Sequence, residues 1–257
     1  MKLSKEEFPT AHQNIQNDAQ ALNRSGEGIF IDGALNPSVY YDQNPKILWI
    51  LKEAYGEQFS YTFEVMNNFA MVFEKLICGI PRHTWAPISI ISNCILDNFK
   101  PYDPAISILD EKDKIEKSLN SIAIININKD PGETGGKSAD INIREGQKYY
   151  ERILRKQIEV LCPDIIICGN TFQYIKHYFN SPNVIKEKGG IKYVDHYMVD
   201  DTIILDPYHP AYTAYGKIDL GLYINDIVRT VKDCFAGSYV IGKNQCIDLH
   251  SNNELLW

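Results

Sequence analysis

Residues 46–56 read KILWILKEAYG, and the five residues from Ile47 to Leu51 are all apolar. A short, continuous apolar run is typical of a strand that is buried on both faces, as in a parallel sheet. Three further runs of this kind are SIAIININ (121–128), PDIIICGN (163–170) and DTIILDP (201–207). The four runs predict the core strands of one buried sheet.

Segments with apolar residues at helical spacing alternate with these strands, at about 4–23, 63–79, 85–98, 144–161, 171–179 and 218–235. The more polar stretch at 190–199 predicts an edge strand, and 238–249 predicts a small hairpin. Strands that alternate with helices indicate a three-layer α/β/α fold with a central, mainly parallel four-stranded sheet. We expect a single domain over residues 1–257, with a helical insertion around 64–120.

The composition indicates a globular protein that does not carry the charge of a typical DNA binder. The chain has 257 residues and 44% hydrophobic content, which is enough for one large core. Its 26 Lys and Arg against 33 Asp and Glu give a net charge of -7, which opposes a polyanionic partner. No apolar run has the length of a signal peptide or a membrane span, so we expect a cytoplasmic protein without a membrane partner.

The six cysteines are Cys78, Cys94, Cys162, Cys168, Cys234 and Cys246. They form no C-x-x-C pair, and several lie inside apolar runs. This pattern favours free, mostly buried thiols in a reducing compartment over a metal site. We therefore expect neither a metal nor a cofactor.

Polar residues follow each predicted core strand, at the edge of a parallel sheet where ligands bind. They are Glu53 after the first strand, Asn126 in the second, Gly169 and Asn170 after the third, and Tyr208 and His209 after the fourth. A carboxylate can orient a water, an amide can pair with a base edge, and an imidazole can stabilise a developing oxyanion. Three aromatic residues in or near the first loop are candidates to stack on a base: Tyr55, Phe59 and Phe63.

In order and spacing, these segments resemble the uracil-DNA glycosylase superfamily. The Gly-Glu-Ala-Pro-Gly motif of that family corresponds here to residues 52–56, KEAYG, its base-reading Asn to Asn126, and its His-Pro-Ser motif to residues 209–211, HPA. The resemblance covers roughly 46–60 and 121–215. It implies catalytic roles for Glu53 and His209, and substrate binding by a larger set: Asn126, Tyr55, Gly56, Phe59, Phe63, Gly169, Asn170 and Tyr208.

The chain departs from the family pattern at Lys52, Tyr55 and Ala211, which replace Gly, Pro and Ser. Family branches with the Glu motif usually hold an iron–sulfur cluster on four cysteines. The cysteines of this chain do not reproduce that arrangement, so we expect no cluster.

Plainer roles stay open for the same residues. Glu53 can cap the following helix or pair with a lysine, Asn126 or Asn128 can satisfy loop backbone, and the two phenylalanines can belong to the core. The segment 131–138, PGETGGKS, partly matches a phosphate-binding loop, but Pro131 stands where the first Gly belongs and the helix begins late. Nucleotide binding is therefore disfavoured.

Two classes of function follow from the sequence. The first is a glycosylase that hydrolyses the N-glycosidic bond of uracil or another damaged base in DNA. The second is a binding protein for a free base, a nucleoside or another small ring on the same fold. The acidic charge and the departures from the motifs favour the second class, whereas the retained Glu53, Asn126 and His209 favour the first.

Overall fold

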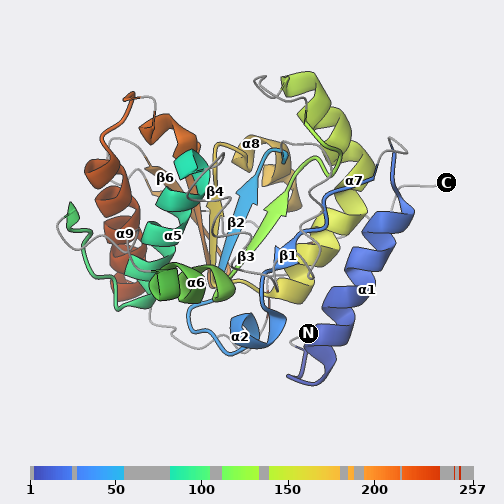
Figure 1. Ribbon diagram of the computed structural model, residues 1–257, viewed down its shortest axis with the longest axis horizontal. Helices are drawn as coiled ribbons and strands as arrows, with labels where there is room; N and C mark the ends of the chain where they lie inside the picture. Colours follow the sequence, from blue (N-terminus) through green and yellow to red (C-terminus); the bar gives the residue numbers. More distant parts are fainter. Residues whose placement is uncertain are drawn as a thin grey trace.

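The computed structural model describes residues 3–24, 28–54, 82–104, 112–132, 139–179, 185–187, 194–214, 216–237, 246 and 249. A seven-stranded mixed sheet lies between two layers of helices (Figure 1). Its strands are β1 (Gly33–Ala34), β2 (Ile47–Leu51), β3 (Ile122–Asn126), β4 (Ile165–Cys168), β5 (Ile185–Glu187), β6 (Val194–Val199) and β7 (Thr202–Pro207). The expected α/β class is confirmed.

The sheet order is β1-β3-β2-β4-β7-β6-β5. The four predicted core strands are adjacent and parallel, in the order β3-β2-β4-β7. Strand β1 pairs antiparallel with β3, and β6 and β5 extend the sheet antiparallel beyond β7. The predicted four-stranded sheet is therefore corrected to four parallel strands inside a larger sheet. The prediction of an edge strand at 190–199 is also wrong, because β5 covers β6, and a three-residue strand is too short to show a periodic pattern.

Burial on both faces explains the continuous apolar run of β2. Ile47, Trp49 and Leu51 pack in the cluster on one face of the sheet, and Leu48 and Ile50 pack in the cluster on the other. The indole of Trp49 donates from Nε1 to the hydroxyl oxygen of Ser92 at 3.1 Å, so its polar atom is satisfied within the core.

Helices α5 (Arg82–Leu96), α6 (Lys112–Asn120) and α9 (Leu220–Gly237) cover one face of the sheet (Figure 1). Helices α1 (Glu7–Ala21), α7 (Asp140–Leu161) and α8 (Phe172–Ile175) cover the other. The smaller elements are α2 (Pro37–Tyr41) and two 3-10 helices, η3 (Lys176–Tyr178) and η4 (Pro210–Thr213). None of the helices in the described ranges combines the length and apolarity needed to span a membrane.

The expected insertion around 64–120 contributes α5 and α6, which pack directly on the sheet as part of one helical layer. Residues 64–81 and 105–111 of the insertion lie outside the described residues. The same holds for the helix predicted at 63–79 and for the hairpin predicted at 238–249, apart from Cys246 and Leu249.

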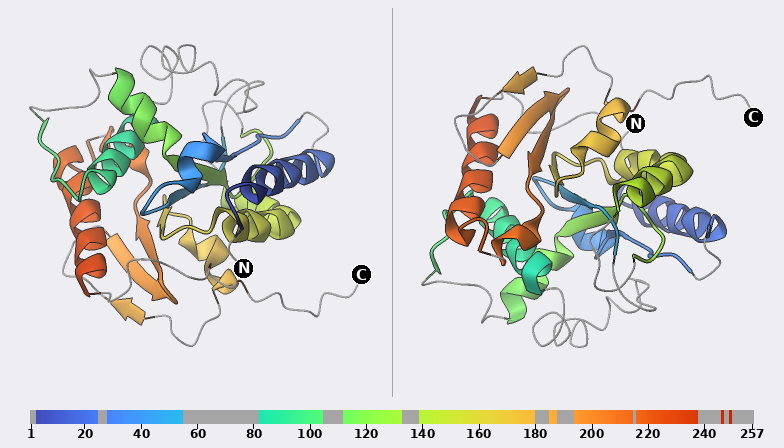
Figure 2. Two further views of the ribbon diagram at one scale, coloured as in Figure 1. Left: turned by 90° about the horizontal axis from the view of Figure 1, so that it is seen from below. Right: turned by 90° about the horizontal axis from the view of Figure 1, so that it is seen from above.

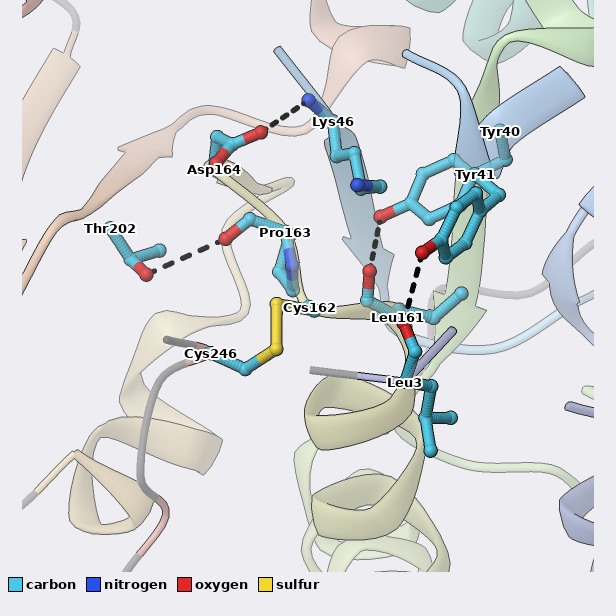
Figure 3. The surroundings of a disulfide bond; sticks show 10 residues. All are labelled: Leu3, Tyr40, Tyr41, Lys46, Leu161, Cys162, Pro163, Asp164, Thr202 and Cys246. Carbon is cyan, nitrogen blue, oxygen red and sulfur yellow. Dashed lines mark hydrogen bonds between the residues drawn. A yellow bond between two sulfur atoms is a disulfide. The ribbon is translucent and has the colours of Figure 1, made fainter. Parts of the chain in front are cut away.

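A disulfide joins Cys162, at the C-terminal end of α7, to Cys246 (Figure 3). The two residues are 84 positions apart in the chain and their Cα atoms are 5.0 Å apart. The expectation of free thiols is therefore wrong for this pair, because only the folded chain brings the two sulfur atoms together. It is confirmed for Cys94, Cys168 and Cys234, and Cys78 lies outside the described residues.

Candidate functional site

The C-terminal ends of β2 and β3 point toward the top of Figure 1, and the right-hand view of Figure 2 looks onto this edge. The chain leaves β2 toward β3 and leaves β4 toward β7, in opposite directions along the sheet. Neighbouring strands β2 and β4 therefore form a topological switch point, where open α/β sheets bind their ligands. The loops after the four parallel strands lie at this edge.

Glu53 follows β2 and is held against the loop that follows β3. The side-chain amide of Asn128 donates from Nδ2 to Glu53 Oε2 at 3.3 Å. Gly132 donates its backbone N–H to the carbonyl of Ala54 at 2.8 Å, and a Cβ at Gly132 would lie only 2.9 Å from the carboxyl carbon of Glu53. The carboxylate therefore has a fixed position between the amide of Asn128 and the backbone of Gly132.

Asn128 is a candidate site residue that the predicted substrate-binding set did not include. Its backbone N–H donates to the carbonyl of Lys52 at 2.8 Å, and its Oδ1 accepts from the backbone N–H of Asp130 at 3.3 Å. A Cβ at Gly146 of α7 would lie 2.3 Å from that oxygen, so only glycine fits there. The alternation of Ile and Asn at 125–128 made both asparagines equal candidates for the site. Of the two, Asn128 is the one that contacts Glu53.

His209 follows β7 and is a neutral hydrogen-bond donor at neutral pH. Its Nδ1 accepts the backbone N–H of Ala211 at 3.2 Å, so in the neutral ring the proton is on Nε2. Burial, together with the smaller effect of the positive charge of Lys52, lowers the pKa of His209 to about 4. A neutral imidazole that presents an N–H can stabilise an oxygen on which negative charge develops.

Gly169 and Asn170 connect the ends of three parallel strands. The backbone N–H of Asn170 donates to the carbonyl of Pro207 at 2.9 Å, and Asn170 has a left-handed φ of 59°. A Cβ at Gly169 would lie 3.0 Å from Leu51 Cδ2 and 3.6 Å from His209 Cδ2. The turn after β4 therefore passes directly beside the imidazole.

Asn126 is buried, and its amide faces Asp32 (a residue beside β1). The backbone N–H of Asn126 donates to Asp32 Oδ2 at 2.6 Å, and its Nδ2 donates to the same atom at 3.3 Å. No contact between Asn126 and Glu53 is among the interactions of the described residues. The reading of a base by Asn126 stays a prediction.

A buried ion pair supports the same loop. Lys129 Nζ lies 2.7 Å from Asp32 Oδ1, with side-chain exposures of 0% and 4%. The ammonium also donates to Gln157 Oε1 at 2.8 Å, and Gln157 Nε2 donates back to Asp32 Oδ1 at 2.8 Å. Burial lowers the pKa of Lys129, and the carboxylate of Asp32 opposes that shift. The pair fixes the start of the loop that seats Glu53.

Of the other predicted site residues, Tyr208 is exposed at the end of β7. Tyr55, Gly56, Phe59 and Phe63 lie outside the described residues, as does most of the segment 131–138. Within the described ranges, no group of three or more His, Cys, Asp or Glu side chains is arranged to hold a metal ion.

Two histidines with a pKa of about 4, His12 and His209, predict a loss of stability in acid. Burial lowers the pKa of His12 from 6.5 to about 4, and its Nε2 accepts the backbone N–H of Ala34 at 2.9 Å. Between pH 6.5 and about pH 4, His12 and His209 bind protons in the unfolded chain but not in the folded chain. Their contribution to the free energy of unfolding is thus full above pH 6.5 and is lost as the pH falls to about 4.

Urea unfolding between pH 4 and 8 measures how much of the acid-induced loss in the free energy of unfolding comes from His12. We expect His12→Gln to reduce the acid-induced loss by about 3 kcal/mol relative to the parent protein. Equal losses in parent and variant would show that His12 does not have the lowered pKa.

No protein-family model matches the chain, and no curated protein matches it significantly. The fold and the strand-end geometry are therefore the grounds for assigning a function. They define an α/β protein with a held carboxylate and a neutral imidazole at a topological switch point.

Proposed function

We propose that the protein is a base-excision glycosylase of the uracil-DNA glycosylase type, which hydrolyses the N-glycosidic bond of a base in DNA. The observation that carries the proposal is the pairing of functions at the β2/β4 switch point. The carboxylate of Glu53, which accepts a hydrogen bond from an amide, follows β2. The neutral N–H donor His209 lies beside the turn that follows β4.

Glu53 acts on the sugar side of the scissile bond. As the bond between C1′ and the base nitrogen breaks, its electron pair leaves with the base and positive charge develops on the sugar. The carboxylate stabilises that charge and orients the water whose oxygen bonds to C1′; the proton that this water loses passes to the carboxylate and then to the departed base. Asn128 holds the carboxylate in place through its bond to Oε2.

His209 acts on the base side. The departing base carries the electron pair, and part of the negative charge reaches its carbonyl oxygen. The Nε2–H of His209 donates to that oxygen, and the nearby charge of Lys52 favours the same charge separation. The lowered pKa keeps the ring neutral over the physiological range, as this role requires.

Binding of a free base or nucleoside without chemistry is the second candidate, and the net charge of -7 favours it. The same donors and acceptors would then recognise the edge of a small ring. The two candidates differ in one measurable respect, because only the first releases a base from an oligonucleotide.

Base release from oligonucleotides that carry uracil, hypoxanthine or a mismatched thymine tests the proposal. We expect Glu53→Gln and His209→Ala each to lower the rate by about 10²- to 10⁴-fold, the range for a lost acid–base or oxyanion-stabilising group. Glu145→Gln and His177→Ala, at exposed positions on α7 and η3, are matched controls that retain the parent rate. Circular dichroism confirms that each variant is folded.

Absence of both base release and DNA binding would contradict the proposal. If the parent releases no base from any of these oligonucleotides and shows no salt-sensitive DNA binding, the glycosylase proposal is wrong. Titration with free uracil and with nucleosides then tests the second candidate.

A further inference from the structure

One large aromatic residue is exposed within the strand-end loops. Among the described residues, the large hydrophobic side chains that are exposed are Leu22, Ile141, Tyr149, Tyr208 and Leu222. The other four lie at the C-cap of α1, in α7 or in α9, whereas Tyr208 directly follows a parallel strand and directly precedes His209. Tyr208 is 47% exposed. A substrate bound at His209 can therefore contact this ring.

Tyr208 has a defined position and an aromatic neighbour. The hydroxyl of Tyr223 donates to the carbonyl of Tyr208 at 2.6 Å, which anchors its backbone to α9. The ring of Tyr212 lies 5.8 Å from that of Tyr208, centroid to centroid, with a tilt of 39°. The Tyr212 backbone N–H donates to the carbonyl of His209 at 2.9 Å, so both tyrosines are tied to the segment that carries the imidazole.

A cation completes this surface. Lys217 is exposed, and its Nζ lies 5.1 Å from the centroid of the Tyr212 ring. Tyr208, Tyr212 and Lys217, which we name the tyrosine surface, therefore combine two rings with one positive charge. Aromatic rings with an adjacent cation are the elements that bind unpaired nucleotides, the rings by stacking on bases and the cation by contact with phosphate.

We infer that the tyrosine surface stacks on a nucleobase next to the one that is cleaved, and that the substrate is therefore single-stranded DNA. The inference rests on the proposed function and specifies its substrate. In a duplex the faces of each base are already stacked on neighbouring base pairs, so a tyrosine ring reaches them only after unstacking. In a single strand those faces are accessible at no such cost.

The acidic charge of the protein agrees with this mode of binding. Duplex binders that neutralise many phosphates lose affinity steeply with salt, but stacking depends little on ionic strength. If Lys217 and Lys52 each contact one phosphate, the two contacts would give a slope of about -1.4 in log K against log salt. A protein of net charge -7 can bind a single strand in this way without a large basic face.

Fluorescence anisotropy with a short, labelled oligothymidylate tests the inference, in the Glu53→Gln background so that the probe stays intact. We expect Tyr208→Ala to weaken binding roughly 5- to 150-fold, the range for one lost base–aromatic stack. Tyr208→Phe keeps the ring and should bind like the parent, whereas Tyr208→Leu keeps the apolar surface alone and should bind like the alanine variant. Leu222→Ala, at an exposed position on α9, is the control that changes nothing.

The inference is overturned if Tyr208→Ala binds the single strand as tightly as the parent, if Tyr208→Leu binds like Tyr208→Phe, or if duplex binds as tightly as single strand. The base-release assay decides the reaction separately. Base release that is unaffected by Tyr208→Ala overturns the tyrosine surface and keeps the glycosylase. Single-strand binding that depends on the ring, in a protein that releases no base, supports the tyrosine surface and overturns the reaction.

Discussion

Replacing Lys129 with methionine is expected to lower the free energy of unfolding by about 3–5 kcal/mol, the range for breaking a buried ion pair from one side. The side chain of Lys129 is completely buried, and its ammonium contacts both oxygens of Asp32, at 2.7 and 2.9 Å. Methionine fills a similar volume but leaves the Asp32 carboxylate buried without its cation. Urea unfolding at neutral pH measures the loss.

Two companion variants identify the cause. Lys129→Met combined with Asp32→Asn removes both charges together and should recover part of the loss, because the cost comes from the unpaired ion. Lys5→Met removes a lysine that pairs with Asp42 at the surface, where the side chains are 57% and 54% exposed, and should change stability by less than about 1 kcal/mol. A similarly small change for Lys129→Met would contradict the buried pair.

The second large effect concerns the disulfide. We expect Cys246→Ser to lower the free energy of unfolding by about 2–5 kcal/mol, because the bond closes a loop of 84 residues and restricts the unfolded chain. The bond also lies close in sequence to Leu249, which is buried in the core cluster beside α1, α7 and α8. Its loss therefore removes a covalent link three residues from this buried leucine.

Reduction provides an independent check of the same bond. Dithiothreitol should lower the stability of the parent to that of Cys246→Ser and leave the variant unchanged. Cys234→Ser, which alters a free and partly exposed thiol, should have little effect. If the parent gains no titratable thiols on reduction and its unfolding curve does not move, the disulfide is not formed in the protein.

The four parallel strands and most helices were predictable from local pattern. A strand buried on both faces excludes polar residues from its whole length, as Ile47–Leu51 illustrates, and a helix buried on one face shows a spacing of three and four. Strands β1 and β5 were missed because two or three residues are too few for a pattern. Helix α7 begins at Asp140, before the predicted 144, because its first three residues are exposed and the buried positions begin only at Ile143.

Part of the candidate site was recognisable in the sequence. Glu53 and His209 were identifiable because each follows an apolar run, and the end of a buried strand is where a polar residue is exposed to ligands. The contact between Asn128 and Glu53 was not identifiable, since it depends on the register between the loops that follow β2 and β3. The pairing of Lys129 with Asp32 spans 97 residues and leaves no local signal.

The sequence by itself therefore determined the class of fold, the parallel core and the residues at the strand ends, because burial imposes a pattern on neighbouring residues. The tertiary structure alone decided the strand order, the antiparallel extension of the sheet, the Cys162–Cys246 bond and the seat of Glu53. Each of these joins residues that are distant in the chain. Apolar runs as alike as those of β2, β3, β4 and β7 do not specify which of them are neighbours, so long-range pairing emerges only when the whole core packs.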